Sequence, residues 1–361
     1  MNVVITGGAG FLGSRLAREL LAAGSLDVAG GGARPLSRVT LIDQAPVPPD
    51  LAADGRVTAI QGDLGQLLDP LAGGPGTLSG ADVIFHLAAA VSGECETDFD
   101  LGIRANLRAT EALLASCRVL GTNPVVVFSS SLAVFGGSVD HPLPEAVDDQ
   151  TLPNPQTSYG TQKAIGELLL ADYTRKGFLR GRALRLVSIS VRPGRPNAAA
   201  SGFMSGIIRE PLAGQHAICP VDPATEVALA SPARAIAGLR CAATTSDQAW
   251  GGRSAVNLPA LTVSVADMAE ALTRVAGPEV SALIDWRPDP DVARIVATWP
   301  ARVRANRASR LGLTPDPDFD SIIRMHLAES RPGAVLASSP GGPIPPDPLG
   351  ERRPPPSPPE V

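Results

Sequence analysis

Three glycines spaced three residues apart follow the first apolar run of the chain and open a helical pattern. Residues 6–13 read TGGAGFLG, which places Gly7, Gly10 and Gly13 in the spacing G-x-x-G-x-x-G. Glycines at such a junction allow a tight turn, a close approach of backbone to a pyrophosphate and close packing of helix on strand. The N-terminus of the helix then faces the negative charge. The segment therefore predicts a dinucleotide-binding strand–turn–helix unit.

Short apolar runs alternate with helical patterns through the first half of the chain, which is typical of a parallel sheet with crossover helices. The apolar runs are rich in Val and Ile and do not alternate with polar residues, as burial of both sheet faces requires. We expect strands over residues 2–6, 38–43, 57–61, 82–86, 125–129 and 183–190. We expect helices over residues 11–23, 99–120 and 158–176. The predicted fold class is α/β, a doubly wound parallel Rossmann sheet with a smaller C-terminal substrate lobe.

The second half of the chain has more proline and glycine and shorter elements. We expect helices over residues 202–212 and 232–244, a strand over 255–258, and a helix from 264 or 265 to just before Gly277. The glycine-rich stretches 27–38 and 73–80 are expected to be solvated loops. We divide the chain into an NAD-binding Rossmann domain (1–191), a substrate lobe (192–329) with some elements returning to the sheet, and a Pro-rich disordered tail (330–361).

Composition argues against several classes of protein. The 361 residues are 44% hydrophobic and carry a net charge of −5 without a basic cluster, so no nucleic-acid partner is expected. The four cysteines stand far apart and the histidines do not cluster, so neither a metal site nor a disulfide framework is expected. The first residues lack the basic lead-in of a signal peptide, and no run approaches the ~20 apolar residues of a membrane span. We expect a cytoplasmic protein with no membrane partner.

Asp43 ends the second expected strand, after the run VTLI. A carboxylate at this place accepts hydrogen bonds from the adenosine ribose and repels a 2′-phosphate, so NAD is expected rather than NADP. The insert 27–38 places Asp43 about thirty residues after the glycines, where about twenty is usual. The next two strands end in GDL (62–64) and HLAAA (86–90), which puts small or polar groups at the same edge.

A second constellation joins a serine-ended strand to a Tyr-x-x-x-Lys helix. Residues 125–136 read VVVFSSSLAVFG, and Tyr159 and Lys163 stand four residues apart at a helix start, so they share one helix face. A neighbouring ammonium favours the phenolate and lowers the phenol pKa by about 1–3 units from its usual value of about 10. We expect Tyr159 to act as a general base, with a serine of the strand holding the substrate oxygen.

At these residues the chain resembles the extended short-chain dehydrogenase/reductase family, also called the NAD-dependent epimerase/dehydratase family. The motifs TGGAGFLG, GDL, FHLAA, SSSLAVFG and YGTQK occur in family order. The resemblance implies a catalytic set of Ser131, Tyr159 and Lys163, and a homodimer formed through the helices that follow the fourth and fifth strands. It also implies the cofactor contacts Gly7, Gly10, Phe11, Leu12, Gly13, Asp43, Asp63, Leu64, Ala88, Asn106, Tyr159 and Lys163.

Within the family, two features narrow the expected activity. Glu226 stands in the segment where sugar-nucleotide epimerases usually carry an arginine that grips the diphosphate. Segments 91–94, 99–102, 190–201 and 206–212 resemble the members that use NAD to oxidise a short aldonic acid, such as D-erythronate, at carbon 2. The resemblance therefore implies an NAD-dependent dehydrogenase that acts on the CH–OH group of a small hydroxy acid.

Two alternatives stay open. One is a sugar-nucleotide epimerase that uses the same Ser/Tyr/Lys set with tightly held NAD. The other is a non-catalytic NAD-sensing protein, against which the intact catalytic set argues. Release of NADH on addition of substrate separates the dehydrogenase from the epimerase.

The substrate residues follow from the chemistry of a short hydroxy acid, which has little apolar surface and must be bound by charge and hydrogen bonds. An arginine fork suits its carboxylate. Arg192 follows the sixth strand at the sheet's carboxyl edge, so we expect it to hold the carboxylate, with Arg209 as second choice. Ser92, Ser131 and Asn197 are expected to bind the oxygens of the acid.

Overall fold

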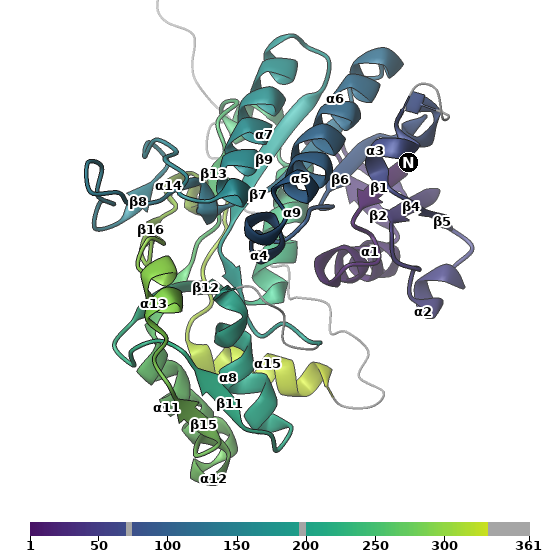
Figure 1. Cartoon of the computed structure of the whole chain (residues 1–361). Coiled ribbons are helices and arrows are strands. Elements are labelled where there is room, and N and C mark those ends of the chain that lie inside the picture. The colour runs from purple at the N-terminus through teal and green to yellow at the C-terminus, as the bar shows by residue number, and fades with distance from the viewer. Residues whose placement is uncertain (70–73, 195–199, 331–361) are drawn as a thin grey trace, which may run out of the picture.

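Seven parallel strands form the central sheet in the order β13-β9-β7-β6-β1-β4-β5. The computed structural model describes residues 1–69, 74–194 and 200–330 (Figure 1). The strand order reverses direction between β1 and β6, so the sheet is doubly wound, as the sequence predicted. The strands are β1 (Asn2–Thr6), β4 (Arg38–Asp43), β5 (Val57–Gln61), β6 (Val83–His86), β7 (Val125–Ser131), β9 (Arg180–Leu186) and β13 (Val256–Asn257).

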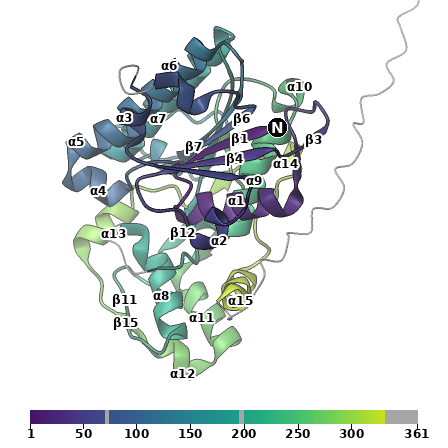
Figure 2. The same cartoon turned by 90° about the vertical axis from the view of Figure 1, so that its right-hand side faces the viewer.

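Helices cover both faces of this sheet (Figure 2). On one face lie α3 (Leu64–Leu67), α6 (Ala109–Leu120) and α7 (Ser158–Arg175), and on the other lie α1 (Phe11–Ala23) and α9 (Pro232–Thr244). The side chains buried on the two faces form two separate apolar clusters. Burial on both faces is the physical reason why β1, β4, β6 and β7 contain continuous apolar runs, whereas β9 carries the buried arginines Arg182 and Arg185.

A third apolar cluster lies outside the sheet and forms the core of a smaller lobe. It joins α8 (Phe203–Leu212), α11 (Val265–Ala276) and α15 (Phe319–Glu329). Two small sheets complete the lobe: β10 (Ser188–Ile189), β12 (Glu226–Ala230) and β14 (Leu261–Ser264) form one, and β11 (Ala217–Cys219) and β15 (Ile284–Trp286) form the other.

The remaining elements are short. They are β2 (Ser25–Asp27), β3 (Ala33–Pro35), α2 (Pro49–Ala52), η1 (Gly74–Leu78), α4 (Ser92–Thr97), α5 (Phe99–Gly102), η2 (Ile103–Arg108), η3 (Leu132–Val134), β8 (Val147–Asp148), η4 (Ala200–Gly202), α10 (Asp247–Trp250), α12 (Pro278–Ser281), α13 (Pro290–Val296), β16 (Val303–Arg304) and α14 (Asn306–Arg310).

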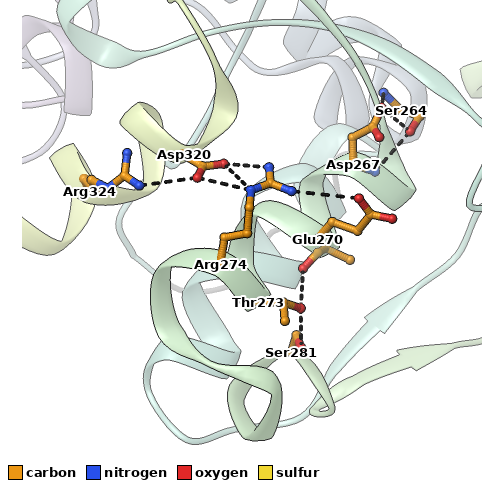
Figure 3. A network of polar contacts seen from close by, with 9 residues as sticks. Ser264, Asp267, Glu270, Thr273, Arg274, Ser281, Asp320 and Arg324 are labelled. Atoms are coloured by element: carbon orange, nitrogen blue, oxygen red, sulfur yellow. Dashed lines mark hydrogen bonds and ion pairs between the residues drawn. The ribbon is translucent and has the colours of Figure 1, made fainter.

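Ion pairs connect α15 to both halves of the molecule. Asp320 of α15 accepts hydrogen bonds from Arg274 of α11, with a shortest distance of 2.7 Å, and from Arg324 on its own helix (Figure 3). At the other end of α15, the two carboxylate oxygens of Glu329 accept hydrogen bonds of 2.6 and 2.8 Å from Arg15 of α1. The last helix therefore joins the smaller lobe to the helix that follows the glycine-rich turn.

Several predicted elements differ from the observed ones. Segment 27–38 was expected to be a loop, but β2 and β3 pair as an antiparallel hairpin between residues 25 and 35, which satisfies their backbone groups locally. The predicted helix 99–120 contains a π-helical segment at η2, and the predicted strand 183–190 is divided into β9 and β10. The predicted tail lies, from residue 331 on, outside the described residues. Within the described ranges no helix has both the length and the apolar character needed to cross a bilayer.

The junction of β1 and α1 generates a prediction for stability. A Cβ atom on Gly13 would overlap the carbonyl oxygen of Gly7, and both groups belong to rigid backbone. We expect Gly13→Ala to lower the free energy of unfolding by about 1–3 kcal/mol, as overpacking does. Urea unfolding measures the change. Gly55→Ala is the matched control, because a Cβ atom there meets no atom within 4 Å. Equal stability of the two variants would contradict the packing argument.

Candidate active site

A cavity of about 690 Å³ opens at the carboxyl edge of the sheet, where residues of the smaller lobe form part of its wall. Met204, Val296 and Trp299 contribute to the wall from the lobe. Most of the predicted site residues line this single space: Gly7, Gly10, Phe11, Leu12, Gly13, Asp43, Asp63, Leu64, Ala88, Ser92, Ser131, Tyr159, Lys163 and Arg192. Asn197 lies outside the described residues.

The glycine-rich turn holds a fixed carboxylate and an uncapped helix end side by side. Gly7 N–H donates to the carbonyl oxygen of Ile42, at 2.8 Å, which ties the turn to the end of β4. The next residue, Asp43, accepts hydrogen bonds from the backbone N–H groups of Ala9 (2.9 Å) and Ala45 (3.0 Å). Helix α1 has no side-chain cap and no acidic residue in its first turn, so its N-terminus is free to face an anion.

This arrangement fits NAD. The uncapped N-terminus of α1 and the backbone of residues 7–13 would hold the pyrophosphate, and Asp43 would bind the adenosine ribose. Asp63 has a structural task as well, because its carboxylate caps α3 at Gln66 N–H (3.0 Å) and accepts a hydrogen bond from Gln44 (3.1 Å).

Helix α7 brings Tyr159 and Lys163 to the cavity, and its start is well fixed. Thr157 caps the helix by accepting a hydrogen bond from Gly160 N–H at 3.0 Å, and Glu96 accepts one from Ser158 N–H at 2.7 Å. A Cβ atom on Gly160 would overlap the carbonyl oxygen of Ala133, so glycine lets the helix approach η3 closely. Helix α7 therefore packs directly against the segment that follows Ser131.

Lys163 is buried beside the end of β7. Its Nζ donates to the carbonyl oxygen of Ser129 at 2.8 Å and lies 5.5 Å from the centroid of the Tyr159 ring. Burial lowers the pKa of Lys163 to about 8, against the opposing effects of Cys95 and Glu167. The ammonium group thus loses its proton near neutral to mildly alkaline pH rather than in the usual lysine range.

Tyr159 differs from the sequence prediction in the direction of its pKa. We expected Lys163 to lower it, but burial raises the pKa of Tyr159 to about 12, and the charge of Cys95 adds to this increase. A hydrogen bond with Ser131 and the positive charge of Arg192 act in the opposite direction. Desolvation of the phenolate outweighs these favourable contacts, because a buried charge loses its hydration.

The three serines at the end of β7 have different partners. Ser129 donates to the carbonyl oxygen of His86 at 3.1 Å, and Ser130 donates to Glu167 at 2.5 Å. Ser131 lines the cavity, lowers the pKa of Tyr159 through its hydroxyl group and accepts a hydrogen bond from Ala133 N–H at 3.1 Å. Among the three, Ser131 has the position that the family resemblance implied for the catalytic serine.

Asn106 is buried beneath the cavity and is not part of its wall. Its Oδ1 accepts a hydrogen bond from Ala90 N–H (2.7 Å), and its Nδ2 donates to the Ala90 carbonyl oxygen (3.1 Å) and to Gln162 (2.8 Å). The amide therefore fixes the loop after β6, which does line the cavity. A direct cofactor contact from Asn106 stays a prediction.

Arg192 and Arg209 have different environments. Arg192 lines the cavity and forms no ion pair with any residue in the described ranges; its Nη2 donates to Ser201 at 3.4 Å. Burial, and then the charge of Arg209, lower the pKa of Arg192. Arg209 is paired with Glu210 (2.5 Å) and donates to the carbonyl oxygen of Arg192 (2.7 Å). Arg209 therefore supports Arg192, whose guanidinium is the one left available to an anion.

Sequence reasoning missed two groups near the cavity. Glu167 lies on the same face of α7 as Tyr159 and Lys163, one helical turn further on, so the helical period could have found it. Trp299 lines the cavity from a loop of the smaller lobe and belongs to no motif. No metal-ligand cluster of three or more His, Cys, Asp or Glu side chains is present in the part of the chain that the structure describes.

Comparisons with known proteins agree with this geometry. D-erythronate dehydrogenase from Cupriavidus necator is 51% identical over 330 residues, which cover 91% of this chain and 99% of that protein. D-erythronate dehydrogenase from Haemophilus influenzae is 40% identical over the same shares. The crystal structure of a nucleoside-diphosphate-sugar epimerase from Agrobacterium tumefaciens has a TM-score of 0.83 at 43% identity and covers 93% of this chain and 96% of its own.

A family model also matches residues 3–228, which include the glycine-rich turn, the serine-ended strand β7 and the Tyr159–Lys163 helix. The chain therefore belongs to the NAD-dependent epimerase/dehydratase family.

Proposed function

We propose that this chain uses NAD to oxidise a short 2-hydroxy acid, such as D-erythronate, to its 2-oxo acid. The two relatives named D-erythronate dehydrogenase match nearly the whole chain and support this substrate class. Segment 192–329 acts as the substrate lobe in this proposal. The homodimer expected through the helices after the fourth and fifth strands has support from exposed apolar side chains there, Val119 of α6 and Leu168 of α7.

The position of Arg192 is the observation that carries the proposal. Its guanidinium lines the cavity without an ion-pair partner in the described ranges, and its charge acts on the Tyr159 phenol. In a 2-hydroxy acid, the carboxylate is bonded to the carbon that carries the reacting hydroxyl group. A cation close to the proton acceptor therefore suits this substrate class, and an arginine fork binds both carboxylate oxygens.

The proposed reaction assigns one role to each residue. Tyr159, as phenolate, takes the proton of the C2 hydroxyl group while the C2–H bond breaks and the C–O bond becomes a carbonyl. NAD⁺, when bound, supplies the acceptor of that hydride. Ser131 donates a hydrogen bond to the substrate oxygen, and the Lys163 ammonium opposes the cost of the buried phenolate. The products are the 2-oxo acid, NADH and one proton.

Glu226 argues against a sugar-nucleotide substrate. Its carboxylate lies at the cavity wall and is paired with Arg302, at 2.9 Å. At this place a carboxylate lines the wall, and its partner Arg302 is already engaged by Glu226 and Glu145, so neither side chain offers an unpaired cation to a diphosphate.

Mixing the protein with D-erythronate and NAD tests the proposal. We expect NADH absorbance to rise with each turnover, and NADP to support little reaction because Asp43 repels its 2′-phosphate. Conversion of a sugar nucleotide without net NADH would instead establish an epimerase. Tight NAD binding without turnover of any short hydroxy acid would indicate an NAD sensor.

Replacement of the phenol tests the general base. Tyr159→Phe should lower kcat by about 10²–10⁴-fold, because the proton acceptor is lost while the ring still packs. The affinity for NAD, measured by fluorescence titration, should stay within a few fold. Tyr173→Phe removes the second of the two tyrosines and is the matched control on the same helix. Near-normal turnover of Tyr159→Phe at any pH would contradict the assignment.

Lysine substitutions distinguish the two arginines. Arg192→Lys should raise KM for the hydroxy acid at least about tenfold, because the ammonium group loses the bidentate geometry, and NAD affinity should not change. Arg175→Lys, an exposed substitution at the end of α7, serves as control. If Arg192→Lys behaves like the wild type while Arg209→Lys raises KM, the carboxylate is held by Arg209 instead.

A further inference from the structure

A buried polar cluster that the proposed reaction does not use adjoins the cavity and reaches its wall at Ser130. We define the buried clamp as Ser130 of β7, Glu167 of α7, Arg185 of β9 and Asn257 of β13. These side chains belong to residues that are 1%, 7%, 5% and 0% exposed, respectively. Side chains from four elements between residues 130 and 257 therefore meet at one ion pair.

The clamp has a specific geometry. Arg185 donates to both oxygens of Glu167, from Nε to Oε1 at 2.9 Å and from Nη2 to Oε2 at 2.7 Å. Ser130 Oγ donates to Oε1 of the same carboxylate at 2.5 Å. The guanidinium of Arg185 also lies 4.7 Å from the centroid of the Phe135 ring and donates to Asn257 at 3.4 Å. Both carboxylate oxygens are thus occupied, and the guanidinium of Arg185 neutralises their charge.

A buried ion pair is weak evidence for stability, because desolvation of two charges offsets much of their attraction. Apolar side chains of similar volume would serve packing alone. What an ion pair adds is direction, since a bidentate contact fixes the relative position of the elements that carry it.

The clamp fixes the elements that carry the catalytic groups. Ser129 and Ser130, the two residues before Ser131, are each held by a side chain of α7: the Ser129 carbonyl oxygen by Lys163 and the Ser130 hydroxyl by Glu167. Tyr159, Lys163 and Glu167 succeed one another at intervals of one helical turn. The strand end is therefore attached to the catalytic helix at two adjacent points.

We infer that Glu167, backed by Arg185, is a positioning residue that aligns Ser131 with Tyr159 by holding Ser130. The inference rests on the proposed function for the roles of Ser131 and Tyr159, but its geometry does not depend on which acid is oxidised. Catalysis depends on such alignment, and a displacement of about 1 Å can cost about a hundredfold in rate.

The Ser130→Ala variant breaks the link and keeps the ion pair. We expect kcat to fall about 10- to 100-fold, with KM for the hydroxy acid and the affinity for NAD within about threefold of the wild type. Ser116→Ala is the matched control, because Ser116 is an equally buried serine whose hydroxyl donates within α6, to Ala112 at 2.8 Å. A kcat equal to that of Ser116→Ala would overturn the inference.

A second variant, Glu167→Gln, tests the inference through the pKa of Lys163. The titratable groups that interact with Lys163 are Glu167 on its own helix, Cys95 on α4 and His86 on β6. Its Nζ also lies near the rings of Tyr159 and Phe128 and donates to the Ser129 carbonyl oxygen. The charge of Glu167 raises the pKa of Lys163, so its removal should lower that pKa below the wild-type value of about 8. The alkaline limb of kcat should move to lower pH as well, because Lys163 loses its proton earlier. Ser130→Ala keeps the charge and should leave the Lys163 pKa unchanged.

The Lys163 pKa can be measured without any substrate. The chain has two lysines, Lys163 and the exposed Lys176, so nitrogen NMR of the lysine side chains gives two signals with an internal reference. Asp247→Asn is the control, since it breaks the pair with Arg182 on the same strand as Arg185.

If Glu167→Gln only lowers the melting temperature and leaves both the Lys163 pKa and the pH profile unmoved, the clamp is merely structural. If the wild type does not oxidise a hydroxy acid but the Lys163 pKa still moves, the proposed function is wrong and the coupling of Glu167 to the site stands.

Discussion

A parallel sheet that is covered on both faces leaves its ends as the places where polar chemistry can reach solvent. Here α1 and α9 cover one face and α3, α6 and α7 cover the other, so the central strands β1, β4, β6 and β7 are apolar along most of their length. Polar groups such as Asp43 and Ser131 therefore occur where strands end. The reversal of strand order between β1 and β6 separates the crossover connections at that edge, and the cavity opens there.

Desolvation dominates the electrostatics of the cavity. Burial raises the pKa of Tyr159 to about 12 and lowers that of Lys163 to about 8, so each group is driven toward its neutral form. Ser131 and Arg192 oppose the effect at Tyr159. The groups that stabilise a charged phenolate are therefore already in place around the buried phenol. The site needs little reorganisation when a substrate and the positively charged ring of the oxidised cofactor bind.

The sequence predicted the parts of the molecule that depend on local pattern. The runs 2–6, 38–43 and 57–61 are strands with the expected bounds, and α1 spans the expected residues 11–23. Most of the residues that the glycine spacing and the Tyr159–Lys163 interval pointed to lie along one cavity, and their roles stay predictions. The local sequence pattern carried no information about contacts between distant residues. The hairpin at residues 25–35 had no alternating pattern, and the Glu167–Arg185 contact joins residues that look like ordinary surface charges in a helix and a strand. The direction of the Tyr159 pKa was missed for the same reason, because burial is a property of the whole fold.

The central sheet cannot be completed until the short strand β13 has been synthesised, because β13 pairs with the edge strand β9. Val256 and Asn257 pair with β9 at Leu184 and Arg185, some seventy residues after β9 leaves the ribosome. During that interval the edge of the nascent sheet at β9 is unpaired, and Arg185 lacks its contact with Asn257. An unpaired edge strand invites association with other chains, so the newly made first half is the stage most exposed to aggregation and to chaperone binding. The nucleotide-binding half is therefore completed late, by residues that follow α8 and β12 of the smaller lobe in the sequence.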